Sequence, residues 1–422
     1  MLKLKLHWQI LIAILIACLA GTLTAQDTSI FGVSLYVTYD FIGSLFLNAL
    51  RMIMVPLIMA SIIMGISGIS ASGNLGRLGG KTLVYYLASS FIAILTGLVL
   101  VNLIQPGILA GAPAGQQLGL AENLGQIIEK VEGRGISDLA AIFLRMVPTN
   151  IVAAAAEGQM LGLIFFSLVF GFFMTRIDKG PANSLQNFWQ GVFQTMMKVT
   201  LWVMSFAPIG VFGLVAKTVT ATGFSAFVPL LSFFLTVLLA LAYHTFITLP
   251  LVLKFIAHVN PWRHFRAMST ALLTAFSTAS SSATLPMTLK CIEENAGVSN
   301  RTSSFVLPLG ATVNMDGTAL YECVAAIFIA QAYGLELTFA TQFTIVLVAL
   351  LTSIGVAGIP AASLVAITII LTAIGLPIEA IGLILVTDRI LDMCRTAVNI
   401  FSDSCGTVVI AKSEGEDKVL AE

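Results

Sequence analysis

One strongly apolar stretch near the end of the chain carries more charge than a lipid-facing helix tolerates. Residues Thr387–Lys412 read TDRILDMCRTAVNIFSDSCGTVVIAK. With 100° per residue, the polar side chains fall within an arc of about 80°. They are Asp388, Asp392, Arg395, Asn399 and Asp403. Each ion at the bilayer centre costs at least about 2.5 kcal/mol, so such residues face protein or a watery cavity. This polar stripe indicates either a buried salt-bridge ladder or a site for a charged ligand, and five polar groups exceed what packing needs.

The composition predicts an all-α polytopic membrane protein. Hydrophobic residues make up 58% of the chain and charged residues only 10%, whereas a soluble domain carries about 25% charged residues. The 21 Lys and Arg balance the 21 Asp and Glu, so the net charge gives no indication of a nucleic-acid partner. The five cysteines are scattered without metal-type spacing, and we expect reduced core residues.

Six apolar runs in the first part of the chain are long enough to cross a bilayer, which takes about 20 residues. They fall at roughly 8–25, 41–70, 83–105, 139–175, 190–216 and 225–256. The first is expected to be an uncleaved span, not a secretory signal. We expect interruptions at Pro56 and within Met146–Asn150.

Lys and Arg collect on one side if each of these runs crosses once. The residues are Lys3, Lys5, Arg77, Lys81, Arg176, Lys179, Lys254, Arg263 and Arg266. Positive charge marks the cytoplasmic side, so we expect a cytoplasmic N-terminus and an extracellular loop over Gly107–Gly135.

The pattern changes after residue 262. Ala267–Lys290 is too polar for lipid and breaks at a serine run, and Thr338–Ala373 has two apolar halves split around Ser353–Ser363. Because irregular backbone at membrane depth must be shielded by protein or line a cavity, both segments are predicted to be re-entrant helical hairpins.

Each predicted hairpin is followed by a polar or broken helix. Arg301–Gln331 can cross, but Asn314–Thr318 in its middle favours an unwound segment. Hairpin 267–290 with helix 301–331, then hairpin 338–373 with helix 376–411, suggests an inverted repeat. Secondary transporters place their binding sites at such repeat interfaces.

Four motifs in this second part occur together and in order. They are TASSSATLP at Thr278–Pro286, NMDGTALY at Asn314–Tyr321, SIGVAGIP at Ser353–Pro360 and DMCRTAVNIFSD at Asp392–Asp403. With them the chain resembles, over essentially its whole length, the dicarboxylate/amino acid:cation symporters, which include the glutamate and aspartate transporters. The resemblance implies eight transmembrane helices plus two re-entrant hairpins, a homotrimer, and a multi-pass position in the inner (plasma) membrane with both termini cytoplasmic.

The resemblance also implies two domains that move against each other. Residues 1–79 (helices 1 and 2) and 108–220 (the extracellular loop with helices 4 and 5) would form a scaffold domain. Residues 80–107 (helix 3) and 221–422 (helix 6 to helix 8 with both hairpins) would form a transport domain. The transport domain would slide across the membrane like an elevator, with the second hairpin as outer gate.

The resemblance implies a site for an acidic amino acid on the polar stripe. Arg395 would bind the side-chain carboxylate of the substrate, and Asp392 would accept its ammonium group. The remaining contacts would come from Ser280, Ser281, Ser282, Thr318, Val356, Ala357, Gly358, Ile359, Thr396 and Asn399. Arg395 could instead be a pure partner of Asp392, and the serine run could serve turn chemistry alone. Because family members specific for dicarboxylates lack an acid at the position of Asp392, the expected substrate is L-glutamate or L-aspartate, with a C4-dicarboxylate as the alternative.

The resemblance further implies sodium as the coupling ion and no other cofactor. One site would use Asp403, Asn399, Gly310 and Asn314. A second would use Tyr86, Ser89, Ser90, Asn314 and Asp316, and a third the carbonyls of Thr312, Ser353 and Ile354. Sodium requires oxygen ligands, which carboxylates and unwound carbonyls supply. The alternative role for Asp316 is a capping turn residue.

Two positions depart from the pattern of archaeal relatives. An arginine that these relatives carry before the serine run is Ala279 here, and we expect Arg389, three residues before Asp392, to supply the missing charge. A plain pair of Arg389 with Asp388 is the alternative. Glu322 stands where sodium-only relatives have glutamine and resembles the proton-carrying residue of animal glutamate transporters, so we expect it to couple a proton to the cycle.

Other functions find less support in the sequence. An intramembrane enzyme that uses Ser280–Ser282 lacks a His or Lys base beside the run, and an anion channel lacks a cation-lined pore. The four histidines, far apart and without a carboxylate at ligand spacing, are predicted to be interface or loop residues; they are His7, His244, His258 and His264.

Overall fold

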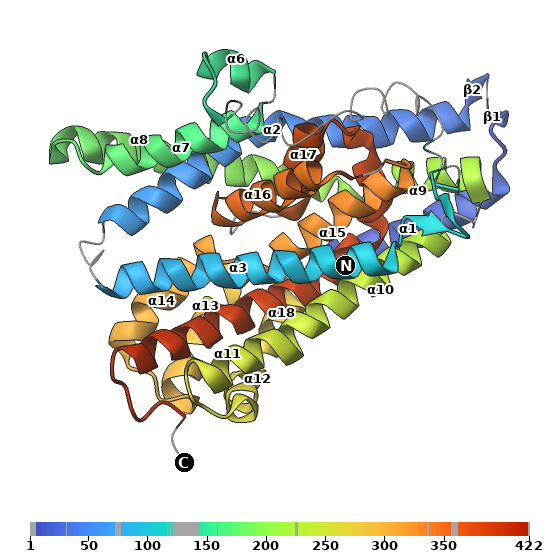
Figure 1. Ribbon diagram of the computed structural model, residues 1–422. Helices are drawn as coiled ribbons and strands as arrows, with labels where there is room; N and C mark the ends of the chain where they lie inside the picture. The colour runs from blue at the N-terminus through green and yellow to red at the C-terminus, as the bar shows by residue number, and fades with distance from the viewer. Residues whose placement is uncertain are drawn as a thin grey trace, which may run out of the picture.

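The computed structural model is a bundle of long helices with two very short sheets (Figure 1). It describes residues 6–30, 32–71, 77–115, 117–118, 120, 144, 146–157, 159–223, 227–335, 337–355 and 362–420. The sheets are antiparallel pairs, β1 (Ser29–Ile30) with β2 (Val33–Ser34) and β3 (Ile108–Leu109) with β4 (Ala112–Pro113). Most of the described chain is therefore helical, as expected, but the all-α prediction did not include these two strand pairs.

The helices of the first half are α1 (Leu6–Leu23), α2 (Leu35–Ala71), α3 (Arg77–Ile104), α6 (Ile151–Ala156), α7 (Met160–Met174), α8 (Lys179–Ser205) and α9 (Ala207–Thr222). Those of the second half are α10 (Phe227–Tyr243), the π-helix η2 (His244–Thr248), α11 (Leu249–Phe255), α12 (Pro261–Thr278), α13 (Ser281–Lys290), the π-helix η3 (Cys291–Asn295), α14 (Asn300–Val313), α15 (Asp316–Ala332), α16 (Phe339–Gly355), α17 (Ala362–Ile374), the 3₁₀ turn η4 (Ile378–Ala380) and α18 (Ile381–Ser413).

Several of these helices are long and apolar enough to cross a membrane. Within the described residues they are Leu35–Ser67, Arg77–Ile104, Phe227–Phe255 and Asn300–Ala332. The pair α8 and α9 makes a fifth candidate, bent by 49°. The chain is therefore a helical membrane protein, as its composition indicates.

The breaks in these helices differ in part from those expected. The predicted interruption at Pro56 is wrong, because α2 continues through it. A membrane helix tolerates the loss of the one backbone hydrogen bond that a proline removes, because neighbouring helices can satisfy the freed carbonyl group. The predicted interruption within Met146–Asn150 is present: residues 147–150 are not helical, and the Asn150 side chain caps the following helix α6 by accepting from the backbone N–H of Val152 and Ala153. The bend between α8 and α9 at Phe206 was not predicted; a proline in the first turn of α9 explains it.

The second half contains the reversals that the sequence predicts. Between α12 and α13 the chain turns at Ala279, whose φ of 49° is left-handed, and at Ser280, whose hydroxyl accepts from the N–H of Ala283. Only Asn314 and Met315 separate α14 from α15. Helix α16 ends at Gly355 and α17 begins at Ala362, so the predicted tip residues Val356–Ile359 lie outside the described residues.

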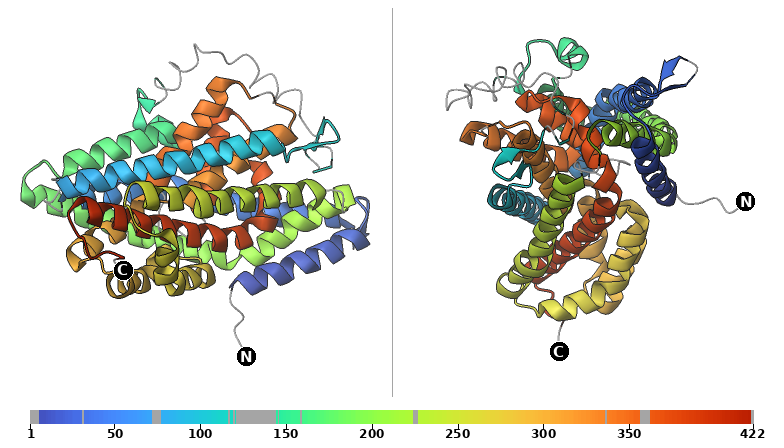
Figure 2. Two further views of the ribbon diagram at one scale, coloured as in Figure 1. Left: turned by 60° about the horizontal axis from the view of Figure 1, so that its bottom comes forward. Right: turned by 90° about the vertical axis from the view of Figure 1, so that its right-hand side faces the viewer.

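The helices form two packed groups. In the first group, α1 packs on α9, and α2 packs on α7, α8 and α9. In the second group, α18 packs on α10, α12, α14 and α15, and α3 packs on α15. The groups meet where α9 contacts α18, and where α2 and α7 contact α16 and α17. The hairpin of α12 and α13 lies at the edge of the molecule, at the bottom of Figure 1 and of the right-hand view in Figure 2.

Polar contacts fasten both ends of α3 to the second group. At one end, the Gln331 side chain donates to the carbonyl of Val101 and accepts from the N–H of Gly107, both at 3.2 Å. At the other end, Lys81 and Arg77 bind the Glu414 carboxylate at 2.5 and 3.1 Å. Helix α3 therefore belongs with the second half of the chain in space, although α6 to α9 separate them in sequence.

The segment Glu414–Leu420 closes the same end of the second group. The Glu416 carboxylate accepts from the N–H and hydroxyl of Ser299 and from the hydroxyl of Thr302, at 2.5 to 2.8 Å, and the N–H of Leu420 donates to the carbonyl of Ala296. Partial burial raises the pKa of Glu416, but the hydrogen bonds from Ser299 and Thr302 outweigh it and leave the pKa below its usual value.

Replacing Glu416 by glutamine should lower the apparent Tm of the purified protein at neutral pH. The native pKa of Glu416 is depressed, so its contribution is present above the ordinary glutamate pKa and is lost as the pH falls through the native value. For a half-exposed, charge-assisted contact we expect about 1 kcal/mol. Thermal unfolding in detergent measures this difference across pH, and Glu416→Gln should converge with the parent in acid. Glu294→Gln, which removes only an exposed 3.9 Å pair with Lys290, is the control. A difference that persists in acid would contradict the assignment.

Candidate functional site

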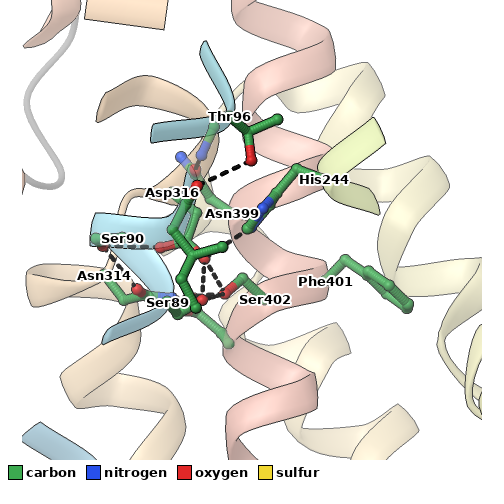
Figure 3. Close-up of polar contacts among 12 residues, drawn as sticks. Ser89, Ser90, Thr96, His244, Asn314, Asp316, Asn399, Phe401 and Ser402 are labelled. Carbon is green, nitrogen blue, oxygen red and sulfur yellow. Dashed lines mark hydrogen bonds and ion pairs between the residues drawn. The ribbon is translucent and has the colours of Figure 1, made fainter. Parts of the chain in front are cut away.

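A fully buried carboxylate, Asp316, lies where α14 gives way to α15. Its two oxygens accept hydrogen bonds from side chains of three other elements (Figure 3). Ser90 of α3 donates at 2.8 Å, Ser402 of α18 donates at 2.6 Å, and Ser89 of α3 also donates. His244 of η2 places Nε2 3.1 Å from the same carboxylate. Since a buried ion is stable only when it is paired and hydrogen-bonded, these donors explain how Asp316 is accommodated.

The break between α14 and α15 places a second polar residue in the same cluster. Asn314 has extended backbone angles, and its amide donates to Ser402 at 3.1 Å and to the Asp403 carboxylate at 2.9 Å. Its side-chain oxygen accepts from Ser90 at 3.2 Å. Asn314 therefore joins the two carboxylates, Asp316 and Asp403, within one cluster.

Gly310 lets α14 approach the second carboxylate closely. A Cβ at this position would lie 2.6 Å from Asp403 Oδ1 and 2.5 Å from the Tyr86 hydroxyl, nearer than real Cβ atoms come. The Tyr86 hydroxyl donates to the carbonyl of Val306 at 2.8 Å. Seven of the eight predicted members of the first two cation sites thus lie together: Tyr86, Ser89, Ser90, Gly310, Asn314, Asp316 and Asp403. The eighth, Asn399, bonds the N–H of Gly317 and the hydroxyl of Thr318.

This cluster has the chemistry of a site for a hard monovalent cation. Its polar atoms are carboxylate, hydroxyl and amide oxygens, which Na⁺ prefers to softer ligands. Within the described residues no three His, Cys, Asp or Glu side chains form a transition-metal site. Serine hydroxyls that now donate to Asp316 can rotate and turn a lone pair toward a cation. The residues present therefore fit sodium.

The sequence analysis missed two residues of this cluster, His244 and Ser402. His244 is 0% exposed and contacts Asp316, so its expected place at an interface or in a loop is wrong. His264 is also buried, with Nε2 2.9 Å from the Ser404 hydroxyl, and that prediction is wrong as well. His258 is exposed, as expected. Ser402 borders the polar stripe, beside Asp403, and this position was the available signal.

Arg395 lies at the centre of a separate ionic cluster on α18. It is 1% exposed, and its Nη2 pairs with Asp388 at 3.0 Å and with Asp392 at 3.1 Å. The guanidinium carbon stands 3.9 Å from the ring centroid of Tyr321. Arg389 Nη1 pairs with Asp392 at 3.2 Å, so the contact expected for Arg389 is present, while Asp388 pairs with Arg395.

The guanidinium of Arg395 is only partly satisfied. Among the described residues, Nε and Nη1 have no hydrogen-bond partner although both atoms are buried. Buried donors without a partner carry a desolvation cost of about 1–3 kcal/mol, more for charged groups. A carboxylate matches the planar fork of a guanidinium and would satisfy both atoms. Arg395 does pair with Asp392, but this pairing leaves Nε and Nη1 without a hydrogen-bond partner among the described residues.

A cavity of about 50 Å³ borders this ionic cluster. Asp388, Arg389 and Asp392 line one wall. The other wall is apolar and comes from α1, α2, α8, α9, α17 and the start of α18, through Ile10, Phe46, Met204, Ala207, Val211, Leu364 and Leu385. The volume suffices for water beside polar partners. This half of the polar stripe therefore faces a cavity, not a dry helix contact.

The other predicted ligand-binding residues are placed as follows. Asn399 accepts from the N–H of Gly317 at 2.8 Å and donates to the Thr318 hydroxyl at 3.1 Å. Thr396 donates to the carbonyl of Asp392, one turn before it. Of the serine run, Ser280 caps α13, Ser281 is buried and Ser282 is exposed.

The third predicted cation site would use backbone carbonyl groups, of Thr312 near the end of α14 and of Ser353 and Ile354 in the last turn of α16. Thr312 has an exposed side chain whose hydroxyl donates within α14, and Ser353 donates to the carbonyl of Leu350 within α16. No hydrogen bond among the described residues joins Thr312, Ser353 and Ile354. Glu322, by contrast, is fully buried on α15 and accepts from the hydroxyl of Thr352 at 2.9 Å.

Comparison with known proteins gives a consistent result. Residues 6–413 match the model of the sodium:dicarboxylate symporter family. The chain is 35% identical to the proton/glutamate-aspartate symporter of Escherichia coli over 98% of its own length and 94% of that protein. It is 34% identical to the proton/sodium-glutamate symport protein of Geobacillus stearothermophilus, over 99% and 96%. It is also 34% identical to human excitatory amino acid transporter 3, over 97% and 86%.

Sodium should stabilise the purified protein through the Asp316 cluster. A ligand that binds only the folded state adds about 2.7 kcal/mol at 100 times its dissociation constant. We therefore expect the apparent Tm to rise with NaCl relative to choline chloride, with a smaller slope in Asp316→Asn and in Ser90→Ala. Ser184→Ala, at an exposed position of α8, is the control. Equal sodium stabilisation of Asp316→Asn and the parent would show that sodium binds elsewhere.

Proposed function

The chain belongs to the sodium:dicarboxylate symporter family, and we propose that it is a secondary active symporter that imports L-glutamate or L-aspartate together with sodium and a proton. The observation that supports this most is the buried Arg395, two of whose guanidinium nitrogens have no partner among the described residues, beside the carboxylate of Asp392. A molecule with both a carboxylate and an ammonium group complements that pair.

The substrate would bind across the polar stripe of α18. Its side-chain carboxylate would accept from Nε and Nη1 of Arg395, and its ammonium group would donate to Asp392. Thr318, Thr396 and Asn399 supply further polar atoms nearby, with Ser280–Ser282 and Val356–Ile359 from the two hairpin tips. Arg389 and Arg395 pair with Asp388 and Asp392, and Arg389 would keep part of the charge of Asp392 compensated when Arg395 turns to the substrate.

A C4-dicarboxylate such as succinate is the second candidate substrate. It would also fit Arg395, but its second carboxylate would meet Asp392 and be repelled. Asp392 already accepts from two guanidinium groups, so it is positioned as an acceptor of cationic donors. An amino acid is therefore favoured over a dicarboxylate.

Sodium would supply the driving force through the oxygen-rich cluster. Asp316, Asn314, Ser89, Ser90 and Tyr86 would hold one ion, and Asp403, Asn399, Gly310 and Asn314 another. Carbonyl groups of Thr312, Ser353 and Ile354 would hold a third once the second hairpin closes. His244 and Ser402 would orient the Asp316 carboxylate between loading and release.

Glu322 would carry the proton. It lies on α15, one turn after Thr318, in a place without water-exposed surface. A carboxyl group there can cross the membrane with its proton and return without it. This role adds a proton to the sodium-driven cycle and accords with the proton-coupled and sodium-coupled relatives.

The architecture we propose has eight transmembrane helices and two re-entrant hairpins with inverted repeats, in the inner (plasma) membrane with both termini cytoplasmic. Residues 1–79 and 108–220 would form the scaffold domain of a homotrimer. Residues 80–107 and 221–422 would move as the transport domain. The attachment of α3 to the second packed group at both of its ends supports this division.

The exposed face of the first hairpin supports an inward-facing assignment for this structure. Leu273 is 68% exposed and Phe276 40% exposed on α12, while α16 and α17 of the second hairpin pack against α2 and α7. In an elevator, the hairpin that leaves the scaffold opens the site to its own side. The first turns of α12 carry Arg263 and Arg266, two of the positive residues assigned to the cytoplasm, so the open side would be the cytoplasmic one.

Arg395→Ala should abolish accumulation of acidic amino acids in proteoliposomes. Truncating one partner of a buried ion pair leaves its aspartates uncompensated and removes the carboxylate-binding fork, so we expect a loss of about 100-fold or more. Counterflow of labelled glutamate against internal glutamate gives the same readout and separates a carrier from an enzyme or a channel. Arg176→Ala, at the exposed end of α7, is the control, and retained sodium stabilisation shows that the variant is folded. Parent-like uptake by Arg395→Ala would refute the proposed site.

Glu322→Gln should make uptake independent of pH while sodium still drives it. The amide preserves shape and hydrogen bonding but cannot gain or lose a proton. The measurement is the initial rate of glutamate uptake from pH 5 to 9 under a fixed sodium gradient. This pH range brackets the usual pKa values of perturbed carboxyl groups. Glu157→Gln, at an exposed position, is the control. A pH profile equal to that of the parent would remove Glu322 from the proton pathway.

A further inference from the structure

The hydroxyl of Thr352 is the hydrogen-bond partner of Glu322 within the described part of the chain. Thr352 Oγ1 lies 2.9 Å from Glu322 Oε2, and both side chains are buried. The same oxygen lies 2.9 Å from the carbonyl of Val348 and 3.0 Å from that of Ala349, in its own helix. One hydroxyl hydrogen thus has three acceptors within reach.

This arrangement gives the hydroxyl two alternative states. When Glu322 is ionised, it can only accept, so Thr352 must point its hydrogen at the carboxylate and release the helix carbonyls. When Glu322 is protonated, its own O–H can donate to Thr352, whose hydrogen then returns to Val348 or Ala349. Both forms are hydrogen-bonded without movement of either helix. The proton itself enters from water on one side of the membrane and leaves to water on the other.

Few charged groups compete with this contact. Helices α10, α16 and α17, which pack on α15, contain no Asp, Glu, Lys, Arg or His. The charged residues of α3, Arg77 and Lys81, lie in its first two turns and bind Glu414. On α18 the charge that acts on Glu322 is Arg395, with its partners Asp388 and Asp392; on α15 itself the titratable neighbours are Tyr321 and Cys323. Thr352 is therefore the neutral donor that the ionised form depends on.

The position of Thr352 connects the proton site to the second hairpin. It directly precedes Ser353 and Ile354 at the end of α16, and Glu322 stands one turn after Thr318 on α15. A change in where the Thr352 hydroxyl points alters the hydrogen bonding of the last turn of α16, just before the hairpin tip begins.

We propose that Thr352 is a positioning residue for Glu322, whose hydroxyl stabilises the ionised carboxylate and thereby sets the pH at which the carrier exchanges its proton. This inference rests on the proposed proton role of Glu322 and adds the residue that tunes it. The substrate and sodium contacts proposed above do not include the Thr352 side chain.

The test is the pH profile of sodium-driven glutamate uptake by Thr352→Val. Valine keeps the shape but removes the hydroxyl, so the ionised form loses its donor and the midpoint of the profile should move to higher pH by about one unit. Thr352→Ser should restore the parent midpoint. Thr344→Val is a matched control on the same helix, about two turns earlier, because Thr344 is buried and, among the described residues, its hydroxyl bonds only the carbonyl of Ala340. If Thr352→Val folds poorly, Thr352→Ala against Thr352→Ser makes the same comparison.

The outcomes separate this inference from the proposed function. If Glu322→Gln abolishes the pH dependence while Thr352→Val keeps the parent midpoint, Thr352 has no tuning role and the proton role stands. If Glu322→Gln keeps the parent profile, the proton role fails and the inference fails with it. If Thr352→Val shifts the midpoint and has no such effect in the Glu322→Gln background, the hydroxyl acts through Glu322, as proposed.

Discussion

The structure depends on keeping ions at membrane depth without exposing them to lipid. Asp316 achieves this with four side-chain donors drawn from α3, α18 and η2, and Asp403 with Asn314. Arg395 achieves it only in part, since two of its nitrogens lack partners within the described chain. A single unbroken helix could not bring these groups together. The break at Asn314–Met315 and the glycine at Gly310 let α14 and α15 meet α3 and α18 closely enough to form the cluster.

Helix α18 carries two separate clusters of charged and polar side chains. On α18, the Asp388, Asp392 and Arg395 cluster borders a cavity, whereas Asp403 and Ser402 two turns later lie in the buried oxygen-rich cluster. Asn399 stands between them and bonds both the backbone and the hydroxyl of the first turn of α15. Occupation of one cluster can thus change the geometry at the other through Asn399 and α15, which is what coupled binding of a substrate and a cation requires.

Much of this arrangement could be predicted because the signals are local and chemical. The polar stripe follows from helical periodicity, the turn at Ser280 from serine capping, and the unwound Asn314 from an Asn-Met-Asp-Gly run. The errors have equally definite causes. Periodicity assumes a regular α-helix, so it gave no reason to expect the π-helix η2, which holds His244 against Asp316 across 72 residues of sequence. Pro56 lies in a helix that its neighbours support, and the bend at Phe206 depends on a proline two residues later. Pairing between distant helices, such as Glu322 with Thr352, leaves no periodic signal at all.

Carboxylates in the segment after α18 bind helices that are far apart in the sequence. Glu414 holds the start of α3, and Glu416 holds the start of α14. Val419 is fully buried against the same group of helices. The segment Glu414–Leu420 therefore connects the end of α18 to the starts of α3 and α14. A probe attached within this segment would strain contacts to three helices at once, whereas an exposed helix position such as Ser184 of α8 is a safer place for a label.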